Sequence, residues 1–288
     1  MSDKGNEGQT SYPLKAWTTF PSDNIFPVRI SSNMVEPKCG PVTVFDANGD
    51  MKKEIFTTIR DYRDTKSLII GLKSNGEELF NIDGNETTNS GFAYFDRALY
   101  SGVAVGPYGT QSAFSQDPQI IAATRNIDSQ PNILASYSLQ DDGQNRPRPR
   151  WQKQEYWYQT HEPGLANLDD NSVSSMEVLL LSDDATLKVL ENNGNVRWQR
   201  KIPSLADRWP MSKLAVGKQS ANGSKMIVVG SNDGVYIISA TGIQRKIFSR
   251  AGYTFDRSAP IICDLDGDGY KEIIIRGTKQ KQVGDITE

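Results

Sequence analysis

The feature that most constrains this chain is a short acidic loop followed at once by an apolar, β-branched run. Near the C-terminus, residues 264–272 read DLDGDGYKE, and isoleucines follow directly. Carboxylates at positions 1, 3, 5 and 9, with glycine at position 6, suit a hard cation that prefers oxygen ligands. An EF-hand would need glutamate at position 12 and a helix, but position 12 is Ile275 and the run is typical of a strand. The sequence therefore predicts a calcium loop within a β-hairpin.

The acidic loop recurs along the chain with the same phase relative to a following strand. Residues 46–54 read DANGDMKKE, and a weaker copy begins at Asp169 and ends at Glu177. A fourth copy, residues 217–225, carries no acids, and the second unit has the long insertion 106–117 in place of the loop. Copies in a constant phase predict a repeat architecture.

Each predicted unit contains a nearly continuous apolar strand and then a hairpin. Such strands are expected where a sheet is covered on both faces. Turn signals follow the first four strands, at Asn75-Gly76, Asp142-Gly143, Asn193-Gly194 and Thr241-Gly242. The apolar strands are predicted at 54–59, 119–123, 177–181, 226–230 and 272–276. Spacings of about 46 to 65 residues favour blades of a β-propeller, each a four-stranded antiparallel sheet.

The fifth unit is incomplete at its C-terminal side, and the N-terminus offers the missing strand. Residues 14–21, around Trp17, resemble the outer strand 195–203 around Trp198. Pairing of an N-terminal strand into the last blade would cover two open sheet edges. We therefore predict an all-β fold: a closed propeller of five blades over residues 12–288 as a single domain, preceded by a flexible tail over 1–11. Six blades, or a fragment of a longer ring, remain alternatives.

The two acidic loops, with the strands that follow them, resemble the FG-GAP/VCBS repeat of integrin-type β-propellers. The resemblance implies a calcium-loaded propeller that serves as an extracellular or cell-surface adhesion, lectin-like or scaffold module, and some such modules are accessory domains of enzymes. The chain departs from the pattern at Met51, which replaces glycine at position 6 of the first loop, and at Val173 in the third.

Candidate metal ligands follow from the loop positions. In the first loop they are Asp46, Asn48, Asp50 and Glu54, and in the fifth loop Asp264, Asp266, Asp268, Glu272 and the backbone carbonyl of Tyr270. Ca²⁺ would act there as a structural ion. The alternative is a metal-free turn, because Asp and Gly favour turns in any case.

An aromatic cluster offers the best candidate for a ligand-binding surface. Trp151, Tyr156 and Trp157 could stack on sugar rings or anchor a protein partner. The alternative is that Trp151 matches Trp198 and Trp17 as a residue that packs one blade against the next.

Several function classes find little support in the sequence. One histidine and no phosphate-binding glycine loop or nucleophile elbow argue against catalysis. A net charge of -3 with dispersed basic residues argues against nucleic-acid binding. No apolar stretch is long enough to span a membrane, and no signal peptide is visible, so an intracellular or particle-associated location stays open.

The function predicted from these observations is a non-catalytic, calcium-stabilised scaffold that binds a protein partner. The alternatives are a carbohydrate-binding propeller, an accessory domain of a polysaccharide-active enzyme, a cofactor-carrying propeller enzyme, and a subunit of a larger assembly.

Overall fold

The computed structural model describes residues 37–39, 41–47, 50–61, 67–74, 93–95, 102–107, 118–123, 132–141, 147–155, 163–169, 176–182, 184–203, 213–255 and 259–279. All regular elements in these ranges are β-strands, so the predicted all-β class is confirmed. The same ranges hold no helix that is long and apolar enough to cross a membrane. The predicted N-terminal closing strand and the tail over 1–11 lie outside them.

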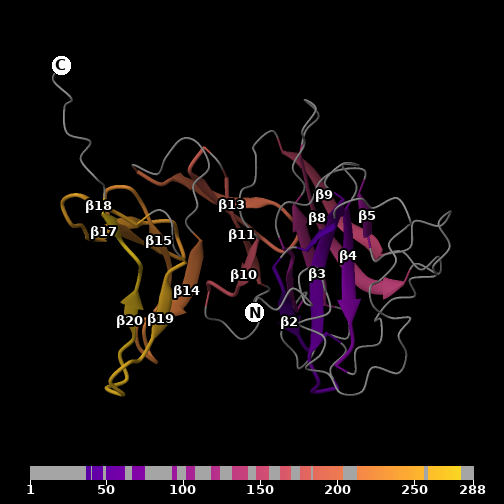
Figure 1. Ribbon diagram of the computed structural model, residues 1–288, viewed down its shortest axis with the longest axis horizontal. Helices are drawn as coiled ribbons and strands as arrows, with labels where there is room; N and C mark the ends of the chain where they lie inside the picture. The colour runs from indigo at the N-terminus through magenta and orange to yellow at the C-terminus, as the bar shows by residue number, and fades with distance from the viewer. Residues whose placement is uncertain are drawn as a thin grey trace, which may run out of the picture.

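Three complete four-stranded antiparallel sheets follow one another along the chain (Figure 1). The second sheet contains β6 (Ala104–Gly106), β7 (Gln119–Ala123), β8 (Asn132–Asp141) and β9 (Pro147–Glu155). The third contains β10 (Gly164–Ala166), β11 (Glu177–Leu181), β12 (Thr186–Leu190) and β13 (Val196–Lys201). The fourth contains β14 (Leu214–Lys218), β15 (Lys225–Gly230), β16 (Val235–Ser239) and β17 (Gln244–Phe248).

The units at the two ends differ from this plan. In the first sheet, β1 (Pro37–Cys39) and β2 (Thr43–Phe45) share one side of β3 (Glu54–Asp61), and β4 (Ser67–Leu72) and β5 (Ala93–Phe95) follow on the other side. The fifth unit has the hairpin β19 (Ile261–Cys263) and β20 (Glu272–Ile274), and a separate pair, β18 (Tyr253–Thr254) and β21 (Thr278–Lys279). Strand β20 is shorter than the predicted 272–276.

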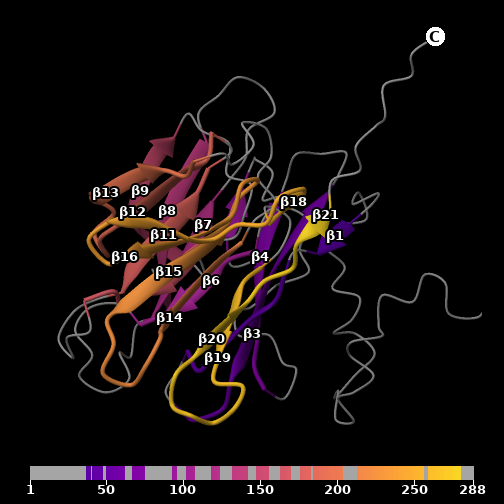
Figure 2. The ribbon, with the colours of Figure 1, turned by 90° about the vertical axis from the view of Figure 1, so that its left-hand side faces the viewer.

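Neighbouring sheets pack face to face through the second strand of each unit, and Figure 2 shows the fourth sheet in front of the third. Strand β11 illustrates the pattern: Val178 packs with residues of the second sheet, and Leu179 packs with residues of the fourth. Alternate side chains of a strand point to opposite faces, so a strand between two sheets must be apolar at every position. This requirement explains the continuous apolar runs. The first strands of successive units also touch, with β2 against β6, β6 against β10, and β14 against β19.

A recurring contact joins the outer strand of one sheet to the hairpin of the next. Trp151 on β9 donates its indole N–H to the Asn192 carbonyl, with 2.6 Å between the nitrogen and the oxygen. Trp198 on β13 makes the same contact with the Ala240 carbonyl at 2.8 Å. Each indole lies against a glycine of that hairpin turn, Gly194 in the first case. The turns predicted at 193–194 and 241–242 are therefore confirmed, whereas those predicted at 75–76 and 142–143 lie outside the described residues.

We expect Gly194→Ala to destabilise the protein by about 1–3 kcal/mol. Gly194 has a φ of 82°, and an added Cβ would lie 2.8 Å from the Trp151 ring. Gly252→Ala is the matched control, because Gly252 has a φ of 73° but nothing within 4 Å of an added Cβ. Denaturant unfolding should show a larger loss for Gly194→Ala than for Gly252→Ala. Equal losses would mean that the Trp151 contact contributes nothing.

Candidate metal-binding loops

The acidic loops and their counterparts connect the first strand of a unit to the second. In the first unit these strands are β2 and β3. The residue that ends each loop pairs with the last residue of the first strand, as Glu54 does with Phe45 and Glu272 with Cys263. Equivalent pairings place Gln119, Glu177 and Lys225 at the same position in the other three units. The loops themselves are thus 46–53, 107–118, 167–176, 219–224 and 264–271.

This register corrects two sequence alignments. The third loop starts at Asn167, two residues before Asp169, because Leu168 donates its N–H to Glu177 at 2.7 Å as Leu265 does to Glu272 at 2.8 Å. The fourth loop starts at residue 219 rather than 217, because Lys218 still pairs with Lys225 in the strands. The sequence comparison missed both shifts because it aligned the acids by spacing alone, without knowing which residues pair across the strands.

The described residues of the first loop repeat two hydrogen bonds of the fifth. The carboxylate at position 9 accepts the N–H of position 2, which is Ala47 with Glu54 at 2.7 Å in the first loop. The carboxylate at position 1 accepts the N–H of position 6, at 2.9 Å for Met51 with Asp46. The fifth loop repeats both hydrogen bonds at 2.8 and 3.0 Å. These two shared hydrogen bonds support the prediction that the two segments are copies of one structural unit.

Position 6 requires a left-handed backbone. Gly269 has a φ of 85°, and Met51 at the same position has a φ of 64°. A residue with a Cβ is strained there by about 1–2 kcal/mol, which glycine avoids. Met51 is also 87% exposed, so burial of its side chain does not compensate for that strain.

Three carboxylates of the fifth loop converge. Asp264, Asp266 and Asp268 each place an oxygen within 4.8 Å of the others. Ligands on opposite sides of a Ca²⁺ ion lie roughly 4.6 to 5.2 Å apart, so this spacing fits a shared ion. Glu272 is not in that group, and one of its oxygens accepts the Leu265 N–H. Tyr270 forms an isolated β-bridge with Ser220 of the fourth loop.

In the first loop, Asp46, Asp50 and Glu54 accept backbone N–H groups at the same loop positions as Asp268 and its neighbours do in the fifth. Asn48 lies outside the described residues. Glu54 is 1% exposed. Burial raises the pKa of Glu54, and the charges of Asp50 and Asp46 raise it further, against the lowering effect of the Ala47 N–H.

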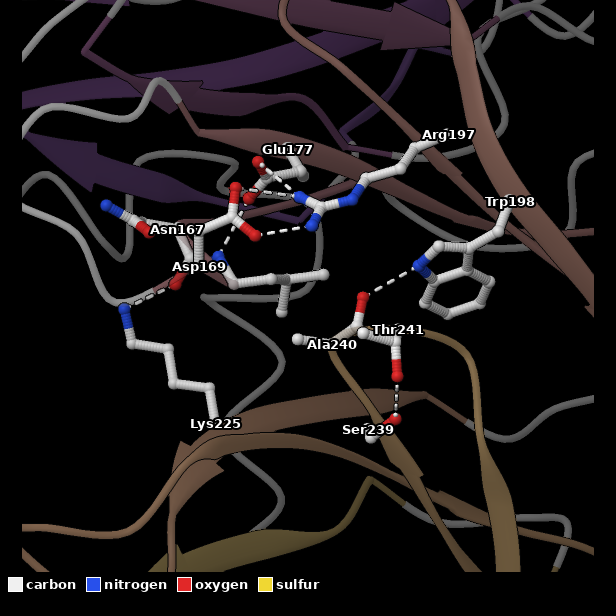
Figure 3. A network of polar contacts seen from close by, with 10 residues as sticks. Asn167, Asp169, Glu177, Arg197, Trp198, Lys225, Ser239, Ala240 and Thr241 are labelled. Carbon is white, nitrogen blue, oxygen red and sulfur yellow. Dashed lines mark hydrogen bonds and ion pairs between the residues drawn. The ribbon is translucent and has the colours of Figure 1, made fainter.

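A positive side chain of a neighbouring strand contacts the third loop, and the sequence analysis did not identify it. Arg197 of β13 donates to both carboxylate oxygens of Asp169, one of them at 2.9 Å, and to Glu177 at 3.1 Å (Figure 3). The hydrogen bond to Asp169 raises the pKa of Arg197. A signal was present in the sequence: an Arg-Trp pair occurs in two outer strands, at 150–151 and 197–198.

The proposed aromatic ligand surface is described only at Trp151. The Trp151 indole is half-buried and packs against Gly194 of the neighbouring sheet, which is the packing role considered as its alternative. Tyr156 and Trp157 lie outside the described residues.

The chain matches no protein-family model and no curated protein. It is similar to a solved structure of the Dos1 propeller, with 8% identity and a TM-score of 0.45, over 78% of this chain and 51% of that one. A structure of BBS1N in complex with ARL6DN has 13% identity and a TM-score of 0.47, over 81% and 61%. BamB from Moraxella catarrhalis has 15% identity and a TM-score of 0.33, over 83% and 73%.

The chain thus spans about half of the matched Dos1 propeller and 61% of the matched BBS1N chain. These similarities are too remote to transfer a ligand, an activity or a partner.

We expect Met51→Gly to stabilise the protein by about 1 kcal/mol, because glycine relieves the left-handed strain at position 6. Met51→Ala is the control, since it removes the same exposed side chain but keeps the strained Cβ. Chemical denaturation of the three proteins in chelator is the measurement. Stabilisation by alanine equal to that by glycine would contradict the explanation by strain.

Glu54 also predicts a pH dependence in chelator. Its pKa is raised in the folded state, so its contribution to stability is full below the ordinary carboxyl pKa and is lost as pH rises through the raised value. Glu54→Gln keeps an acceptor for the Ala47 N–H and removes the charge. We therefore expect the variant to lose less stability than wild type as the pH rises above the ordinary carboxyl pKa. Parallel pH profiles from thermal unfolding would contradict this assignment.

Proposed function

We propose that this chain is a non-catalytic β-propeller of the FG-GAP/VCBS type, stabilised by structural Ca²⁺ in its first and fifth loops. In this proposal it has five blades, an N-terminal strand completes the last blade, and the ring binds a protein partner as an adhesion or assembly scaffold at the cell surface or outside the cell.

The observation that carries the calcium part is the convergence of Asp264, Asp266 and Asp268 on one small volume. All three side chains are exposed, so an ion could enter without rearrangement of the sheets. Without a cation, three negative charges at this spacing repel one another. Carboxylate oxygens are the donors that Ca²⁺ prefers, and a bound ion would supply the missing positive charge.

The scaffold part is supported by the rigid packing between the sheets. Both faces of β7, β11 and β15 are buried against neighbours, so the strands that carry the loops are fixed by packing on both sides. Loops on a rigid framework are the usual place for binding residues. In the described acidic loops, the carboxylates hold backbone N–H groups and do not form a paired acid and base.

We expect Ca²⁺ to raise the thermal midpoint of wild type, by an amount that corresponds to ~2.7 kcal/mol at a hundredfold excess over Kd. Asp264→Asn should reduce this shift. The control is Asp184→Asn, because Asp184 accepts the Thr186 N–H in a turn outside the acidic loops. That variant should be less stable overall but keep the Ca²⁺ shift. An unchanged midpoint with Ca²⁺, in protein shown by elemental analysis to be metal-free, would refute the calcium proposal.

If the chain binds a protein partner, we predict that the long insertion of the second unit contributes to binding that partner. We expect a variant with residues 108–117 replaced by a short Gly-Ser linker to melt normally but to lose at least one protein captured by wild type. Quantitative mass spectrometry of both captures, with purified partner then titrated against both proteins, is the measurement. Equal affinity of the purified partner for the two proteins would contradict the role of this loop.

A further inference from the structure

In the third loop, two carboxylates and a backbone carbonyl contact a guanidinium and an ammonium of the chain. Two of its carboxylates, Asp169 and Glu177, correspond to positions 3 and 9 of the fifth loop, since Leu168 and Leu265 make the same backbone contact. Where the fifth loop has the carboxylate of Asp264 at position 1, the third loop has the neutral Asn167. The third loop therefore has less negative charge to neutralise.

The Arg197 guanidinium lies between these two carboxylates, as Figure 3 shows. It binds Asp169 through two nitrogens and Glu177 through one of them. The Glu177 side chain is only 4% exposed, whereas Arg197 and Asp169 keep 25% and 29% exposure. A buried carboxylate requires a partner of opposite charge, and a bidentate guanidinium is the strongest that a side chain offers.

A local irregularity in β13 accompanies this placement. Leu190 pairs with Val196 and Val189 pairs with Trp198, so Arg197 is the extra residue of a β-bulge. A bulge redirects a side chain relative to the regular alternation of a strand. Trp198 can thus pack against the fourth sheet while Arg197 reaches the third loop.

A second cation reaches the same loop from the next sheet. Lys225, the first residue of β15, donates its ammonium to the Asn167 carbonyl. The loop is therefore bound by a guanidinium of its own sheet and by an ammonium of the fourth sheet. Loop carbonyls and carboxylates are the groups that would otherwise coordinate a hard cation.

We propose that the chain's own cations close the third loop, with Arg197 standing where a divalent ion would sit. Replacement of Arg197 by a neutral residue would then convert the loop into a site for a hard cation. Asp169 and Glu177 would supply its carboxylate ligands. This inference does not depend on calcium in the first or fifth loop.

The test is to count the Tb³⁺ ions bound per chain, by isothermal titration of chelator-treated protein. We expect Arg197→Met to bind one ion more than wild type, whatever number wild type binds. Arg197→Lys should show no gain, because it keeps a positive charge. Arg200→Met is the matched control, since Arg200 lies on the same strand but donates to the Gly242 carbonyl. A folded Arg197→Met protein that binds no additional ion would overturn the proposal.

Loss of folding in Arg197→Met would also be informative. In that case we expect the thermal midpoint to fall in chelator and to recover when Tb³⁺ is added. The triple variant with Asp169→Asn and Glu177→Gln should recover in chelator without any ion, because neither carboxylate that contacts Arg197 remains charged. If the triple variant is as unstable as Arg197→Met, and Tb³⁺ rescues neither, Arg197 acts through packing alone and the proposal fails.

Discussion

Burial of both faces of the second strand in each unit is the constraint on which the rest of this structure depends. Ile120 and Ile121 in β7 are both fully buried, yet they point to opposite sides and contact different sheets. Burial of an aliphatic side chain of this size contributes about 1.5–3 kcal/mol relative to exposure, so a row of such strands supplies most of the apolar stabilisation. In β7, β11 and β15 the polar or charged residue is the first of the strand, next to the loop.

The loops differ in the charge of the residue that ends them and in the hydrogen bonds that this residue makes. In three units a glutamate ends the loop and accepts a backbone N–H: Glu54, Glu177 and Glu272. In the second unit, Gln119 instead donates to the Pro107 carbonyl at 3.1 Å and carries no charge. In the fourth unit the position holds Lys225, which donates to the Asn167 carbonyl. The first and fifth loops are thus closed alike, and the others by different balances of hydrogen bonding and charge.

The contacts that the outer strands make with the neighbouring sheet also differ from unit to unit. Trp151 and Trp198 attach the second sheet to the third and the third to the fourth. The corresponding residue of β17 is Lys246, which pairs with Asp233 of its own sheet instead. The outer side of the fourth sheet consequently exposes Ile247 and Phe248, so this joint differs from the two before it.

Sequence alone determined the strand pattern, because two-sided burial requires continuous apolar runs and left-handed turns favour glycine. It therefore located β7 and β11 at their observed bounds, and it recognised loops 46–54 and 264–272 as copies. Tertiary structure decided the register of the third and fourth loops, the packing of Trp151 and the position of Arg197. These depend on which residues pair across strands and on a bulge in β13, and neither is encoded in local spacing.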